Sequence, residues 1–204
     1  MIAEATRRSA LAGYADRFAE ISTASNGQLA IREIPFLTQI NLRANPAEAD
    51  TIQAFNRTLG FDLPLEANTV SSKGERSALW LGADEWLIVA PPDQQRSIEA
   101  ALHSALGGAG AVVDVSANRT VIEVRGWTAR DLLAHGCAID LDSRAFGPDR
   151  CAQTLLAKAQ VILQQTALTP AFRIYVRASF AAYLADWLLD ATSGPATPRH
   201  RSIP

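Results

Sequence analysis

The feature that most constrains this chain is a hydrophobic pattern that occurs twice, at an offset of 82 residues. At this offset Ile40 aligns with Ile122, and Leu79 aligns with Val161. An apolar helical stripe recurs as well, because positions 98, 101, 102, 105 and 106 match positions 180, 183, 184, 187 and 188. Similarity at a fixed spacing indicates two copies of one structural unit. A chain of 204 residues can bury a substantial core in such an arrangement.

The first copy contains a recognisable order of elements. The segment Phe36–Arg43 predicts a strand, and residues 46–59 predict a helix that ends at a glycine. Two apolar runs, Ala78–Leu81 and Trp86–Ala90, flank a G-A-D-E turn and predict a hairpin. A helical stripe and a final strand, Ala111–Val115, follow. This β-α-β-β-α-β order is typical of a ferredoxin-like, or split βαβ, fold.

The second copy repeats that order less sharply. Thr120–Val124 predicts a strand, and Thr128 opens a short helix. Two or three strands are expected between Cys151 and Arg177, before a last helix. We therefore expect an α+β fold in which two tandem ferredoxin-like halves pack as one body.

The domain boundaries follow from where this pattern begins and ends. Residues 1–30 are expected to form an N-terminal arm, because they are mixed and poorly patterned. Within the arm, the i, i+3, i+7 spacing of Leu11, Tyr14 and Phe18 predicts one short amphipathic helix. Residues 31–191 form the duplicated domain, with halves at about 31–115 and 116–191. Residues 192–204 contain three prolines and no apolar periodicity, and are expected to be a disordered tail.

Composition excludes several classes of function. The chain has 19 basic and 21 acidic residues, interspersed, for a net charge of −2, which argues against a nucleic-acid surface. No apolar run approaches the roughly 20 residues that cross a bilayer, and the N-terminus lacks the apolar stretch of a secretory signal. We expect a cytoplasmic protein without a membrane partner. Cys137 and Cys151 lack the spacing of a zinc site and are expected to be free thiols.

Few residues are candidates for chemistry. His103 and His135 fall at or near helix ends, where a structural role toward the helix dipole is favoured over catalysis. Asp114, Ser116 and Arg119 belong to a D-V-S-A-N-R motif between two strands, and Asp114 at the strand end could bind a polar ligand. The favoured interpretation is that the Asp114 and Ser116 side chains hydrogen-bond the backbone of a turn, in which Asn118 tolerates positive φ.

Asp84 and Glu85 lie in the predicted hairpin turn, where solvated acids are common, and Trp80 and Trp86 are expected to pack as a cross-strand pair. The chain has no G-x-G-x-x-G sequence for a cofactor phosphate. The sequence therefore predicts no catalytic, cofactor-binding or metal-binding residue in this chain.

Four segments resemble a known family, the gamma subunit of heterotetrameric sarcosine oxidase. They are R-R-S-A-L-A (Arg7–Ala12), I-P-F-L-T-Q-I-N-L-R (Ile34–Arg43), L-W-L-G-A-D-E-W-L-I-V (Leu79–Val89) and D-V-S-A-N-R-T-V-I-E-V-R-G (Asp114–Gly126). The same stretches are more distantly similar to the folate-binding domain of the glycine-cleavage aminomethyltransferase, which implies the duplicated α+β fold but no folate site.

The resemblance implies a structural subunit of an enzyme that converts sarcosine, water and oxygen to glycine, formaldehyde and hydrogen peroxide. With tetrahydrofolate, the one-carbon unit is captured as methylenetetrahydrofolate. It further implies that FAD, FMN and NAD are held by other subunits, that tetrahydrofolate binds on alpha, and that this chain packs chiefly on alpha beside beta and delta. The choice of N-methyl amino acid would belong to the flavin-bearing chain.

The N-terminal arm is our expected contact with alpha, through Arg7, Arg8, Leu11 and Tyr14. Two other interpretations stay open from the sequence. One is a stand-alone folate-binding protein of the aminomethyltransferase-like type, and the other is an α+β scaffold with unrelated partners.

Overall fold

Two five-stranded antiparallel sheets form the centre of the molecule in the computed structural model, which describes residues 7–107 and 110–193. Sheet A has the strand order β1 (Ala30–Ile34), β7 (Arg119–Arg125), β10 (Ala171–Arg177), β9 (Ala159–Ala167), β8 (Cys151–Leu156). Sheet B has the order β3 (Val70–Lys73), β4 (Arg76–Gly82), β5 (Glu85–Ala90), β2 (Thr38–Arg43), β6 (Ala111–Asp114).

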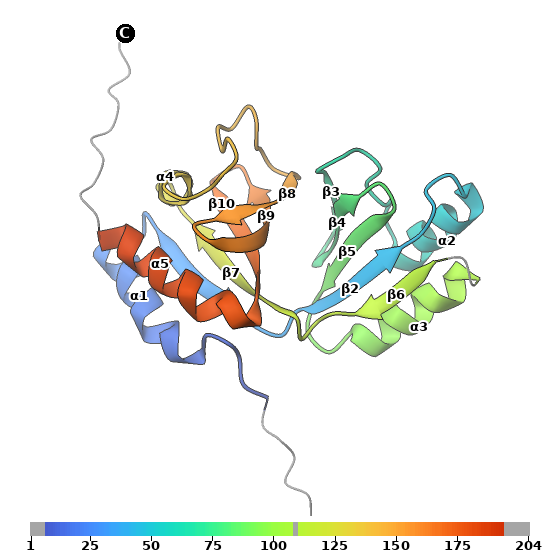
Figure 1. The fold of residues 1–204 in the computed structure, drawn as a ribbon, viewed down its shortest axis with the longest axis horizontal. Coiled ribbons are helices and arrows are strands. Elements are labelled where there is room, and N and C mark those ends of the chain that lie inside the picture. Colours follow the sequence, from blue (N-terminus) through green and yellow to red (C-terminus); the bar gives the residue numbers. More distant parts are fainter. Residues whose placement is uncertain (1–6, 108–109, 194–204) are drawn as a thin grey trace, which may run out of the picture.

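Helices cover the outer face of each sheet, so the layers run helix, sheet, sheet, helix (Figure 1). The outer face of sheet B packs against α2 (Ala49–Leu59) and α3 (Gln95–Leu106). The outer face of sheet A packs against α1 (Ala15–Ala24), α4 (Ala129–Ala134) and α5 (Ala181–Ser193). Short 3₁₀ turns, Ala12–Tyr14 and Ala178–Phe180, precede α1 and α5.

The strand order of sheet B confirms the predicted ferredoxin-like fold. Strands β2, β4, β5 and β6 take the first to fourth positions of a β-α-β-β-α-β unit, and they lie in the order 4-1-3-2 with β3 added at the edge. The helix α2 ends where Gly60 adopts a left-handed conformation with φ of 83°. This half therefore forms from a continuous piece of chain.

Sheet A has the same strand order, but its fourth position is taken by a strand from the N-terminal part of the chain. Strands β7, β9 and β10 take the first three positions, and β1 pairs with β7 in the fourth, from Ala30 opposite Arg125 to Ile34 opposite Val121. This finding corrects two expected boundaries. Residues 31–34 belong to the second half, not the first. Residues 15–24 of the expected arm form the helix α1, which packs on sheet A and so belongs to the second half as well.

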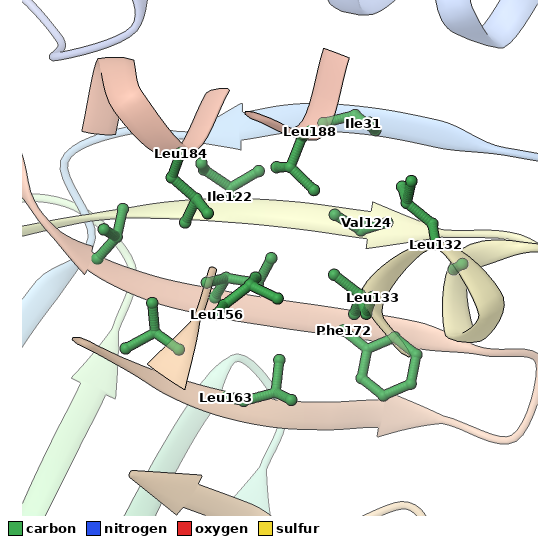
Figure 2. Packing of buried hydrophobic residues seen from close by; sticks show 14 of the residues in the cluster. Ile31, Ile122, Val124, Leu132, Leu133, Leu156, Leu163, Phe172, Leu184 and Leu188 are labelled. Carbon is green, nitrogen blue, oxygen red and sulfur yellow. The ribbon is translucent and has the colours of Figure 1, made fainter. Parts of the chain in front are cut away.

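The C-terminal boundary also differs, because the helix α5 continues through Ser193. The expected tail of residues 192–204 therefore begins within a helix, and its remainder lies outside the described residues. The helix α5 carries apolar side chains onto the sheet. In Figure 2, Leu184 and Leu188 of α5 point toward Ile122 of β7.

The duplication is less regular than a single offset of 82 residues. Ile40 pairs with Ile88 in sheet B, and Ile122 pairs with Ile174 in sheet A, so the third strands are offset by 86 residues. Leu79 faces the space between the sheets, whereas Val161 packs against the helices. The alignment of these two residues is wrong, because a shift by an odd number of residues moves a side chain to the other face of a strand.

A third buried cluster joins the two sheets face to face. It includes Val70, Leu79 and Leu87 of sheet B and Val121, Ile162 and Tyr175 of sheet A. The Tyr175 hydroxyl donates to Gln164 Oε1 over 2.7 Å, so its polar atom is satisfied inside this layer. Because each sheet buries both faces, the halves form one body.

We predict that Gly126→Ala destabilises the chain more than Gly74→Ala does. Both glycines have positive φ, 122° and 61°, but only at Gly126 would an added Cβ lie 2.1 Å from a backbone atom, the Gln28 carbonyl oxygen. We expect a loss of about 1 kcal/mol at Gly74 and about 3–5 kcal/mol at Gly126, measured by urea unfolding. Equal losses would mean that the chain leading into β1 does not dock against the end of β7.

Candidate subunit interface

The expected interface residues of the N-terminus largely contact their own chain. Leu11 is 1% exposed and belongs to the core between sheet A and its helices. The Tyr14 hydroxyl donates to Asp186 Oδ2 over 3.1 Å. The Arg7 guanidinium lies 3.0 Å from Asp93 Oδ1 and 4.2 Å from the centre of the Phe36 ring.

These contacts correct the expected role of Leu11, because a buried core side chain has no surface to offer a partner. Tyr14 and Arg7 retain partly exposed surface, and Arg8 is exposed. A role for Arg7, Arg8 and Tyr14 toward a partner stays a prediction. The i, i+3, i+7 spacing of Leu11, Tyr14 and Phe18 indicates an apolar helical face, which suits the chain's own core as well as a partner.

Two large apolar side chains stand out at one end of sheet A. Trp127 is 72% exposed and Leu168 is 87% exposed. Trp127 follows β7 and Leu168 follows β9, and both strands pair with β10 near Ala171. We call these two residues the apolar tip. Sequence periodicity did not single them out, since both lie in connections outside the periodic segments.

The D-V-S-A-N-R turn has a structural role. Ser116 N and Ser116 Oγ both donate to Asp114 Oδ1, over 2.9 and 2.5 Å, and Gln39 N donates to Ser116 Oγ over 2.9 Å. These bonds fix the crossing from sheet B to sheet A, and they confirm the turn interpretation of Asp114 and Ser116. Asn118 tolerates positive φ but does not adopt it in this turn.

His135 and Glu85, two of the remaining candidates for chemistry, are also engaged in the fold. His135 Nδ1 lies 2.8 Å from the Asp131 carbonyl oxygen at the end of α4. Glu85 accepts from Asn41 Nδ2 over 2.7 Å and pairs with Arg43 over 3.0 Å. His103 lies exposed in the last turn of α3. Across residues 7–107 and 110–193, no three His, Cys, Asp or Glu side chains gather as a metal ion would require.

The tryptophan pair packs as predicted. Trp80 lies opposite Trp86 across the β4–β5 hairpin. Trp86 is fully buried and donates from Nε1 to the Pro64 carbonyl oxygen over 2.7 Å. Both side chains contribute to the core beneath α2 and α3.

Two cavities lie at opposite ends of sheet A. The larger, of about 450 Å³, is lined by Arg32, Arg76 and Arg173 together with the acids Glu75 and Asp149. The smaller, of about 370 Å³, has Arg119, Arg177, Gln153, Thr154, Leu155, Gln160, Val161 and Ile162 around it. Neither cavity follows from the sequence pattern, because each is lined by residues from separate strands. Within the part of the chain that the structure describes, no helix is long and apolar enough to cross a bilayer.

The comparisons with known proteins agree on one family. The model of the sarcosine oxidase gamma subunit family matches residues 43–194. A sarcosine oxidase subunit gamma from Arthrobacter sp. is 39% identical over 194 residues, covering 94% of this chain and 93% of that protein. Another from Corynebacterium sp. (strain P-1) is 40% identical over 189 residues, covering 92% and 90%.

Solved structures give the same result for the fold. A chain of the heterotetrameric sarcosine oxidase from Corynebacterium sp. U-96 superposes with a TM-score of 0.84 at 34% identity, covering 94% of this chain and 98% of that one. The glycine cleavage system aminomethyltransferase T from Bartonella henselae superposes with a TM-score of 0.62 at 15% identity. It covers 79% of this chain but 45% of that protein, and it shows a shared fold alone.

We predict that the two cysteines react in a fixed order with iodoacetamide. Burial raises the pKa of the Cys151 thiol to about 12, and desolvation also raises the pKa of the half-buried Cys137. Because the thiolate is the nucleophile, both react slowly at pH 8, and Cys137 is labelled before Cys151. Peptide mass spectrometry follows both sites. Labelling of Cys151 in the folded chain as fast as Cys137 would contradict this order.

Proposed function

The chain belongs to the sarcosine oxidase gamma subunit family, and from this we propose that it is a non-catalytic, structural subunit of a heterotetrameric sarcosine oxidase. The enzyme oxidises sarcosine with water and oxygen to glycine, formaldehyde and hydrogen peroxide, and forms methylenetetrahydrofolate when tetrahydrofolate is present. Our proposal places this chain mainly against alpha, beside beta and delta, in the cytoplasm.

The observation that carries the proposal is the match to the heterotetrameric enzyme over nearly the whole chain. The TM-score is 0.84 at 34% identity, and the superposition covers 94% of this chain and 98% of the solved chain. The relatives named sarcosine oxidase subunit gamma are likewise covered over 90% or more of their length.

The state of the polar side chains supports a structural role. His135 and Glu85 are bonded to neighbouring groups of the fold, and Asp114 to Ser116. Oxidising an amine requires a redox cofactor, since side chains alone do not accept hydride. We propose that FAD, FMN, NAD and tetrahydrofolate bind to the other subunits, and that this chain stabilises their arrangement.

The apolar tip is the surface that best suits a permanent contact. Single exposed apolar residues are common, but Trp127 and Leu168 lie at the same end of one sheet. Tryptophan is enriched among the residues that dominate interfaces. A stable interface buries about 1,000 Å² or more, so neighbouring residues must contribute as well.

The alternative of a stand-alone folate-binding protein has weaker support. Its basis is the likeness to the aminomethyltransferase, which at 15% identity concerns the fold alone.

The direct test is co-expression with the alpha, beta and delta chains. We expect this chain to co-purify in a complex that oxidises sarcosine, and the purified chain alone to show no turnover and no tight tetrahydrofolate binding. Isothermal titration and a peroxide assay measure both properties. Turnover or tight pteridine binding by the chain alone would overturn the proposal.

The contribution of the apolar tip is tested by Trp127→Ser combined with Leu168→Ser. We expect association with the complex to weaken about 30-fold or more, because a buried interface tryptophan is typically worth at least 2 kcal/mol. Stability of the purified chain should stay unchanged, since both side chains are exposed. Leu65→Ser, at a position that is 58% exposed in the other half, serves as the control. Association equal to the control would exclude the tip from the interface.

A further inference from the structure

Two arginines lie side by side on the face of sheet A that is turned toward sheet B. They are at the end of sheet A where β7 begins and β10 ends. Arg119 of β7 and Arg177 of β10 are directly opposite each other in the strand register. They share a face with Val121 and Tyr175, which pack against sheet B, because alternate residues of a strand point to the same side. A backbone hydrogen bond of 3.0 Å from Ala178 N to Asn118 O extends the ladder past the pair and fixes it.

This pair has unfavourable surroundings for two positive charges. Like charges directly opposite each other destabilise a sheet. Among the residues that the structure describes, neither guanidinium takes part in an ion pair. Burial, and next the Arg177 charge, lower the pKa of Arg119, and Glu85 opposes them from beyond ion-pair distance.

At the opposite end of the same face, the arginines lie near acidic side chains of this chain. There Arg32 pairs with Glu123 over 2.7 Å, and Glu123 lies opposite Arg173 in the strand register. The cavity at that end is also lined by Glu75 and Asp149. The residues lining the cavity beside Arg119 and Arg177 include no acid. Arg173 also forms none of the described ion pairs, but three acids, Glu75, Glu123 and Asp149, lie at its end, whereas Glu85 acts on Arg119 only from beyond ion-pair distance.

The cavity beside the pair has the chemistry of a protein contact. Leu155 lines it with 45% of its surface exposed, and Gln153, Thr154 and Gln160 supply amide and hydroxyl groups. Gln153 is held in place by a hydrogen bond of 2.9 Å from its Nε2 to the Leu81 carbonyl oxygen of sheet B. Exposed apolar surface next to two cations suits a side chain with a methylene stem and a carboxylate better than a small inorganic anion.

We propose that Arg119 and Arg177 form a carboxylate-binding groove that receives an Asp or Glu side chain of a partner subunit in the heterotetramer. This inference rests on the proposed function and adds the contact that anchors the chain. Guanidinium groups present planar, forked donors that match a carboxylate, so one acid can bridge both arginines. The partner's charge then removes the repulsion that the free chain carries.

The two variants Arg119→Gln and Arg177→Gln, alone and combined, test the groove in the co-expressed complex. We expect the double variant to weaken association about 10-fold or more, measured by dissociation of the purified complex on dilution. The melting temperature of the purified full-length chain should not fall and should rise by about 1–3 °C, because the like-charge repulsion is gone. A purely structural pair would instead lower that temperature.

The matched control is Arg96→Gln, because Arg96 is also exposed, lies on α3 in the other half and takes part in none of the described ion pairs.

Carbodiimide coupling of an Arg177→Lys variant, followed by peptide mass spectrometry, should join position 177 to an acidic residue of one partner, whereas Arg96→Lys should not couple. If the wild-type chain joins the complex and the double variant associates equally well, the groove is no anchor, although the proposed function stands. Stabilisation of the free chain by inorganic phosphate through these arginines, with association unchanged, would make it a small-anion site and overturn the proposal.

Discussion

The pairing of β1 with β7 is the interaction on which the rest of this structure depends. In the part of the chain that the structure describes, the fourth strand position of the second ferredoxin-like half, beside β7, is taken by the strand Ala30–Ile34 from the other end of the chain. An uncovered edge would present unpaired backbone groups to solvent or to another chain. The pairing also brings α1 onto the outer face of sheet A, where Phe18 is buried. The N-terminus is thus a structural part of the second half.

With β1 paired to β7, sheet A is complete and stacks on sheet B. This stacking determines which surfaces remain for partners. The middle of sheet A packs on sheet B through Val121, Ile162 and Tyr175, so only the ends of its inner face are accessible. One of those ends carries Arg119 and Arg177, and the exposed connections that follow β7 and β9 carry the apolar tip. A rigid body that presents charge and apolar surface at separate places is suited to holding larger chains in a fixed arrangement.

The sequence predicted the parts of the fold that have a clear apolar pattern. The hairpin around Trp80 and Trp86 was recognisable from two apolar runs that flank a turn, and the helix α3 from its helical stripe. The strand β1 was missed since Ile31 alone of its side chains is fully buried, which leaves no periodic signal. The groove was out of reach for another reason: Arg119 and Arg177 meet only through the register of β7 and β10, which depends on the whole sheet.

Hydrogen exchange of the purified chain, read by mass spectrometry, tests most directly whether the N-terminal strand is integral to the second half. The structure predicts that amides of residues 30–34 exchange as slowly as those of β7 and β10, because all three open only when sheet A unfolds. Exchange of residues 30–34 at the rate of the exposed loops, while β7 and β10 stay protected, would contradict the account, since the second half would then be complete without the N-terminus.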